Sequence, residues 1–274
     1  MKYKIGFDGN GEEEQRTEIM AEQPKAQIPV PSVVQVRFPG QGRSLAYYND
    51  SFDLRVGDVV FVEGKLEGKQ GIVTEVARSF RIKLSDYKRV IATADTKVSG
   101  KLYFGGSHLI AFDKNVIPYA KVRGWFLPPD SEEDVAVGYD DEFNSLEDLS
   151  GFRFRTEIAE RGADYYNSNK VTYLSVDGNY GKAIVLGGTA YELTFEYCSG
   201  EVCNLTCSCF CSYPCKHEFA LLLQLRETLE KIEELYDDSY METDYFAAIS
   251  KSVLLQYAVN GKEKGSLVLE SETQ

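Results

Sequence analysis

The sequence predicts an α+β protein in which a small β-barrel-like domain precedes a unit built from a β-hairpin, a cysteine cluster and a helix. Two observations indicate this order. Short β-rich runs broken by Gly, Asn and Asp fill residues 33–112, whereas an amphipathic helical pattern follows the cysteines after residue 215. An acidic stretch separates the two regions, and a length of 274 residues suits two domains.

These patterns divide the chain into five segments. We expect an N-terminal arm over 1–32, the β-barrel-like domain over 33–130, an acidic linker over 131–150, the cysteine-containing domain over 151–240, and a C-terminal helix and tail over 241–274.

The first domain contains the predicted strands in order. They are VVQVRF, LAYYND, GDVVFVEG, KQGIVTEV and FRIKLSDYKRVIATA, each a run of β-branched and aromatic residues ended by turn formers. KLYFGGSHLIAF and AKVRGWFLPPD continue as strand-like pieces.

The second unit mixes element types. ERGADYYNSNKV reads as a helix end and turn, VTYLSVDGNYGKAIVLGG as a hairpin with Asp177-Gly178 near its turn, and TAYELTFEY as a third strand. KHEFALLLQLRETLEKIEELYDD places apolar residues on one helical face, which we expect to pack on the hairpin. YFAAISKSVLLQYAV predicts a further helix, and GKEKGSLVLESETQ a tail.

Charge and hydropathy limit the classes of function. The formal charge of −13 argues against a protein that coats nucleic acid indiscriminately, although residues 33–112 alone carry +4. No run of eighteen apolar residues and no signal-peptide pattern occurs, so we expect a cytoplasmic protein without a membrane partner. In a reducing compartment the six cysteines are expected to be metal ligands or buried thiols rather than disulfides.

The cysteine segment CSCFCSYPCKHEF predicts a metal site. Zinc binds thiolates and imidazoles, and a compact site draws two ligands from a turn and two from the first turn of a helix. Cys207 and Cys209 supply the first pair, and Cys215 and His217 the second. Cys211 is a surplus thiol, so a Cys209-x-Cys211 first pair is an alternative, and a cluster of buried thiols without metal is another.

This pattern resembles the SWIM-type zinc finger, C-x-C-x5-C-x-H followed by an apolar helix. ERGADYYNSNKV, VDGN, KAIVLGGTAYELTF and CKHEFALLL stand in the order of that family, so the resemblance covers roughly residues 157–227. It implies Zn²⁺ held by Cys207, Cys209, Cys215 and His217, and a module that binds DNA or proteins.

The predicted zinc site is structural. A catalytic zinc keeps one position open for water, whereas four protein ligands close the site. We therefore expect Glu218, beside His217, to be a solvated helix residue, and His108 to be a strand or turn residue without a special role. Cys198 and Cys203 flank a turn and are expected to be free thiols.

The stretch VGDVVFVEGKLEGKQGIVTEV, residues 56–76, resembles the KOW motif of small β-barrels in ribosomal and transcription-associated proteins. The resemblance implies contact with nucleic acid or polymerase through phosphate attraction and aromatic stacking. Phe80 and Tyr87 interleave with the cations of this region, and the alternative is a structural barrel with a mixed-charge surface. The candidate nucleic-acid-binding residues are Lys65, Lys69, Arg78, Arg81, Lys83, Lys88 and Arg89.

Two functions remain open from the sequence. The first is a zinc-binding, nucleic-acid-associated protein that binds through residues 33–112. The second is a protein-interaction adaptor in which zinc is purely structural and an acidic C-terminal helix meets a basic partner. No Gly-rich phosphate loop, Ser/His/Asp set or open metal site can be read, so we expect neither an enzyme nor a small-molecule substrate.

Overall fold

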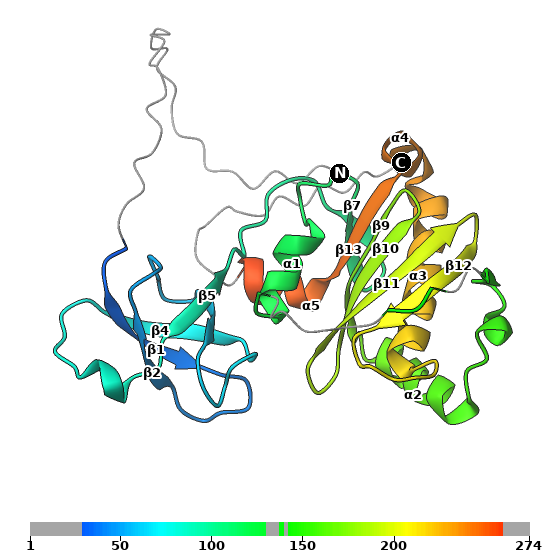
Figure 1. Ribbon diagram of the computed structural model, residues 1–274. Coiled ribbons are helices and arrows are strands. Elements are labelled where there is room, and N and C mark those ends of the chain that lie inside the picture. Colours follow the sequence, from blue (N-terminus) through cyan, green and yellow to red (C-terminus); the bar gives the residue numbers. More distant parts are fainter. Residues whose placement is uncertain (1–28, 130–136, 140–141, 260–274) are drawn as a thin grey trace, which may run out of the picture.

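The computed structural model describes residues 29–129, 137–139 and 142–259. Its strands form two antiparallel sheets, one of five strands and one of eight, and most of its helices cover the larger sheet (Figure 1). The predicted arm over 1–32 lies outside the described residues up to residue 28, as do the whole predicted tail GKEKGSLVLESETQ and parts of the predicted linker.

The first sheet has the order β2-β1-β4-β3-β5. Its edge strands β2 and β5 do not pair, and the chain before β5 reaches β2 through an isolated bridge between Tyr48 and Arg89, so the predicted barrel-like domain is an open sheet and not a closed barrel. Each of the five strands falls within one of the runs predicted from the sequence, to within one residue at either end. Their bounds are β1 Ser32–Arg37, β2 Leu45–Asn49, β3 Val59–Val62, β4 Gly71–Ala77 and β5 Val90–Ala94, with a 3₁₀ turn η1 at Leu84–Asp86.

The second sheet has the order β6-β7-β13-β9-β10-β11-β12-β8. The predicted hairpin is its centre, since β9 and β10 pair directly and Gly178 takes a positive φ of 57° at their turn. The strand bounds are β6 Tyr103–Gly105, β7 His108–Ala111, β8 Asn144–Ser145, β9 Val171–Asp177, β10 Tyr180–Leu186, β11 Ala190–Cys198, β12 Glu201–Cys207 and β13 Tyr245–Ser250.

Helices cover both faces of this sheet (Figure 1). On one face lie α2 and the long helix α3, and on the other lie α1 and α5. The helix bounds are α1 Tyr119–Phe126, α2 Thr156–Asn167, α3 Lys216–Leu235, α4 Asp237–Thr243 and α5 Lys251–Leu254, with the short turns η2 at Leu149–Phe152 and η3 at Leu255–Val259.

The side chains of the central strand β13 point alternately into the cores on the two faces of the sheet. Phe246 and Ala248 pack in the core under α3, while Tyr245, Ala247 and Ile249 pack in the core with α1 and α5. Such alternation is the side-chain period of a strand buried on both faces. The prediction of a helix over the whole of 245–259 was therefore wrong for its first six residues, because two layers of tertiary contacts override local propensity there.

Two further elements differ from the sequence-based expectation. Residues 120–126 were expected to be strand-like, but they form α1, whose Trp125 is fully buried and donates its indole N–H to Asp95 O at 2.7 Å. Residues 103–111 were expected in the first β-rich region, but β6 and β7 join the second sheet through β13. Within the predicted linker, β8 pairs with β12.

The two sheets share part of one core. Val59 from β3 and Val98 from the segment after β5 belong to the same buried cluster as α1 and β13. The hydrogen bond from Trp125 to Asp95 crosses the same boundary. The first sheet is thus packed against the helices that cover the second.

Candidate metal centre

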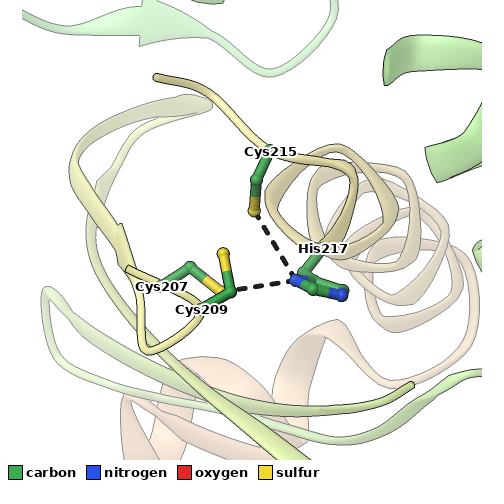
Figure 2. Close-up of side chains that lie close together, drawn as sticks. All are labelled: Cys207, Cys209, Cys215 and His217. Carbon is green, nitrogen blue, oxygen red and sulfur yellow. Dashed lines mark hydrogen bonds between the residues drawn. The ribbon is translucent and has the colours of Figure 1, made fainter. Parts of the chain in front are cut away.

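Four side chains converge where β12 ends and α3 begins (Figure 2). Cys207 is the last residue of β12, Cys209 lies in the following turn, and Cys215 is the N-cap of α3. His217 lies in the first turn of that helix. The turn is tight because Phe210 takes a positive φ of 54° and its N–H donates to Cys207 O at 3.3 Å.

The donor atoms have the spacing that a tetrahedral ion requires. The three sulfurs and one imidazole nitrogen all lie within 4.8 Å of one another. Cys207 Sγ and Cys215 Sγ lie 3.6 and 3.7 Å from His217 Nδ1. Bonds of about 2.3 Å to sulfur and about 2.0 Å to nitrogen at a tetrahedral angle would place sulfur and nitrogen about 3.5 Å apart. The four residues could therefore hold a metal ion without large rearrangement.

The three candidate thiol ligands differ in pKa. The pKa of Cys215 is lowered to about 4, chiefly because the Cys207 thiol donates a hydrogen bond to it, and the backbone N–H of Glu218 adds to this effect. The same contact with Cys215, together with burial, raises the pKa of Cys207, and burial raises the pKa of Cys209 to about 12. One thiolate thus forms readily beside the helix N-terminus, and a cation would be needed to deprotonate the others.

Glu218 is not the solvated helix residue that the sequence suggested. It is buried, and its carboxylate accepts a hydrogen bond of 2.7 Å from the backbone N–H of Cys215. Burial raises the pKa of this carboxyl to about 8. Glu218 and Cys215 form a reciprocal capping box, so Glu218 closes the first turn of the helix that carries two of the candidate ligands.

The turn after Cys207 is fastened to the neighbouring strand. The Ser208 N–H donates to Glu192 O, and the Glu192 N–H donates to Ser208 Oγ, both at 2.9 Å. The Glu192 carboxylate in turn accepts two hydrogen bonds from the Arg123 guanidinium, at 2.6 and 3.0 Å. Strand β11 thereby holds the position of the loop that carries Cys209.

Sequence reasoning did not identify the side chains that surround the imidazole. The Tyr191 ring stacks on His217 and the Tyr165 ring lies beside it. Both tyrosines occupy ordinary helix or strand patterns, so only the apposition of α2, β11 and α3 shows that they line the site.

Cys198, Cys203 and His108 lie apart from this cluster, whereas Cys211 contacts Cys209 without belonging to the group of four donors. Cys211 and Cys198 are exposed and Cys203 is buried in β12. His108 begins β7 as a buried residue, with Nε2 at 2.8 Å from Val171 O and Nδ1 at 2.9 Å from Ser107 Oγ. The described residues contain one group of at least three His, Cys, Asp or Glu side chains close enough to share an ion, and Cys211 is not in it.

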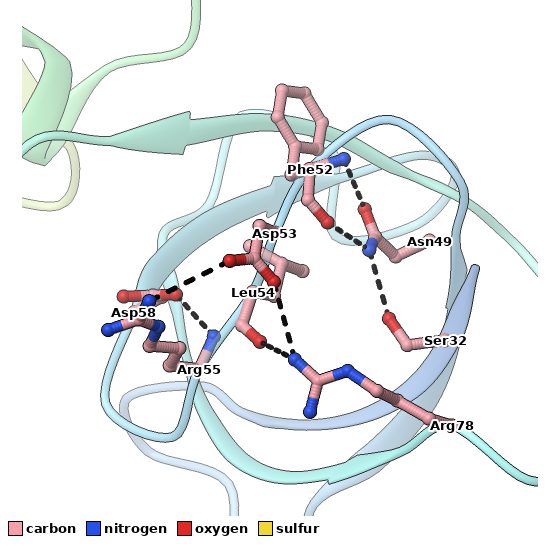
Figure 3. A network of polar contacts seen from close by, with 8 residues as sticks. All are labelled: Ser32, Asn49, Phe52, Asp53, Leu54, Arg55, Asp58 and Arg78. Carbon is pink, nitrogen blue, oxygen red and sulfur yellow. Dashed lines mark hydrogen bonds and ion pairs between the residues drawn. The ribbon is translucent and has the colours of Figure 1, made fainter. Parts of the chain in front are cut away.

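The candidate nucleic-acid residues of the first sheet are all exposed, but two of them are engaged in ion pairs. Arg78 contacts Asp53 at 3.3 Å (Figure 3), and Arg89 pairs with Asp50 and lies over the Tyr48 ring. The other five make no ion pair with any residue that the structure describes. They are Lys65, Lys69, Arg81, Lys83 and Lys88.

The two loops that carry these cations lie next to each other. The Lys88 methylenes pass Gly64 so closely that a Cβ at that position would meet them at 3.5 Å. Phe80, 37% exposed, packs edge-on against Tyr48 at 6.2 Å between ring centroids. Cations and partly exposed aromatic rings therefore gather where the chain before β5 meets β2 at Tyr48 and Arg89.

Comparison with known families, curated proteins and solved structures finds no match to this chain. Within the described ranges, no helix combines the length and the apolar character needed to cross a membrane.

Proposed function

We propose that this protein is a zinc-binding, non-enzymatic protein in which a structural Zn²⁺ fastens β12 to α3. The observation that carries the proposal is the convergence of three sulfurs and one imidazole nitrogen within 4.8 Å. A soft, tetrahedral set of thiolates with one imidazole suits zinc better than magnesium or calcium, which prefer oxygen ligands.

The structural role follows from the number of ligands. Four protein donors complete a tetrahedron, so no position remains for a water or a substrate. The sequence pattern C-x-C-x5-C-x-H and its position between an antiparallel sheet and a helix support a SWIM-type finger as the class of this site. The site requires thiols that stay reduced, so we also propose a cytoplasmic location.

The partner that we propose is nucleic acid, bound at the edge of the first sheet. Lys83 and Lys88 would neutralise phosphates there, while Phe80 and Tyr48 offer rings on which bases could stack. The KOW-like sequence of the β3–β4 hairpin supports the same surface.

A protein-interaction adaptor is the second candidate, and one observation favours it. Residues 227–244 hold eight Asp and Glu residues against one Lys. Leu235 and Met241, in this acidic segment, are 48% and 75% exposed. Such a surface would suit a basic partner with an apolar anchor.

Salt dependence separates the two candidates. Binding of a fluorescent single-stranded oligonucleotide to the full chain should weaken steeply with salt, and the double variant Lys83→Ala/Lys88→Ala should reduce the slope of log K against log salt by about 0.7 for each lost phosphate contact. The matched control, Lys170→Ala/Lys231→Ala, removes the same charge from the second unit and should bind as the wild type does. Equal loss in both variants, or no binding, would contradict the nucleic-acid proposal and leave the adaptor.

A further inference from the structure

The imidazole of His217 lacks the hydrogen bond that usually orients a metal-binding histidine. Its Nδ1 faces the cysteine sulfurs (Figure 2), which leaves Nε2 on the far side of the ring. Nε2 is buried and has no hydrogen-bond partner among the residues that the structure describes. Metal-bound histidines generally donate this second N–H to a carboxylate, carbonyl or water, which fixes the ring. The ring of His217 must be held by some other contact.

Two aromatic rings pack against the imidazole instead. The Tyr191 ring lies nearly parallel to the imidazole, with centroids 4.1 Å apart and an interplanar angle of 21°. The Tyr165 ring lies 5.4 Å away at 59°, and the Lys216 ammonium sits 4.8 Å from the centroid of Tyr165. Face-to-face contact with Tyr191 opposes rotation of the imidazole out of its plane, and Tyr165 limits the space left on its other sides.

The backbone around Tyr191 holds this ring in place. Tyr191 pairs with Val185 across β10 and β11, and the next residue, Glu192, is tied to Ser208 in the ligand loop. Gly187 stands at the end of the same hairpin, where a Cβ would lie 2.8 Å from the Tyr191 ring and 3.1 Å from the Tyr165 hydroxyl. The glycine therefore leaves the space in which the two tyrosines approach His217.

We propose that Tyr191 is the positioning residue of the metal site, and that its stacked ring replaces the missing hydrogen bond at His217 Nε2. The stack fixes the plane of the imidazole, and in that plane Nδ1 points at the sulfurs of Cys207 and Cys215. This role rests on the proposed zinc site. In it, Tyr191 contacts the metal ligand His217 and does not bind the ion itself.

The test compares metal affinity in the full-length wild type and in Tyr191→Leu, by competition for Zn²⁺ with a chromophoric chelator. Tyr191→Leu should bind zinc about 10–100-fold more weakly, the loss typical of removing an outer partner of a ligand. Tyr191→Phe, which keeps the ring, should restore the affinity. Tyr197→Leu removes a partly buried tyrosine from the same strand away from the ligands, and it should bind as the wild type does.

A second readout reports on ligand geometry. The visible absorption of the Co²⁺-substituted protein should change in Tyr191→Leu and remain unchanged in Tyr191→Phe. If Tyr191→Leu does not fold, Gly187→Ala provides the same comparison, since its Cβ should displace the ring. Wild-type affinity and an unchanged Co²⁺ spectrum in the variants that disturb the stack would overturn the positioning role, whereas a wild type that binds no zinc would overturn the proposed function itself.

Discussion

The thermal stability of this protein should depend on free zinc with a slope fixed by the number of sites. An ion that binds only the folded state stabilises it by RT ln(1 + [Zn]/Kd), so each tenfold rise in free zinc above Kd adds about 1.4 kcal/mol. For a domain of about 150–250 residues, 1 kcal/mol shifts Tm by about 2–4 °C. One tetrahedral site therefore predicts a rise in Tm of about 3–6 °C for every tenfold increase in free zinc.

The assay is thermal unfolding followed by circular dichroism in zinc buffers that span several decades of free metal. The structure predicts that Cys211→Ser keeps the wild-type slope, because Cys211 is exposed and lies outside the cluster. Cys207→Ser should abolish the dependence on zinc, because it removes a donor that lies 3.6 Å from His217 Nδ1. A wild-type Tm that does not change with free zinc would refute the reasoning.

Three further predictions concern packing and pH. Gly162→Ala should lower the free energy of unfolding by about 1–3 kcal/mol in urea titrations, because its Cβ would lie 2.7 Å from Phe219 on α3, whereas Gly188→Ala meets no atom within 4 Å and should be near neutral. Burial lowers the pKa of His108, so below about pH 6.5 the imidazole takes up a proton in the unfolded chain but not in the folded one. The free energy of unfolding of the wild type should therefore fall as the pH is lowered below that value. At equal free zinc it should fall less in His108→Gln. Zinc affinity itself should fall as the pH is lowered, because the ligands must lose protons to bind, and a chelator competition that shows the same affinity at pH 5.5 and 7.5 would contradict thiolate ligation.

The candidate ligands were accessible from the sequence because their geometry is local. Cys207 and Cys209 lie on one turn, and Cys215 and His217 lie on one helix start, so eleven residues determine how the donors converge. The hairpin with Asp177-Gly178 at its turn was predictable for the same reason. Turn chemistry and side-chain periodicity act over a few residues and leave a direct trace in the sequence.

Long-range pairings were not predictable in this way. The run 245–250 is a strand only because β7 and β9 flank it and because helical layers cover both of its faces. Glu218 is buried because its side chain accepts a hydrogen bond from the Cys215 N–H at the start of the helix. The residues next to Glu218 in the sequence do not indicate this burial. The stack of Tyr191 on His217 joins residues 26 positions apart on two elements, and neither element's own pattern marks the contact.

The central claim is that Cys207, Cys209, Cys215 and His217 hold one zinc ion, and metal content tests it most directly. Elemental analysis of freshly purified, reduced protein should find one zinc per chain in the wild type and in Cys211→Ser, and none in Cys207→Ser. Zinc that is lost with Cys211 and kept without Cys207 would show that the ligand set is wrong. A wild type without zinc would contradict the account of the site.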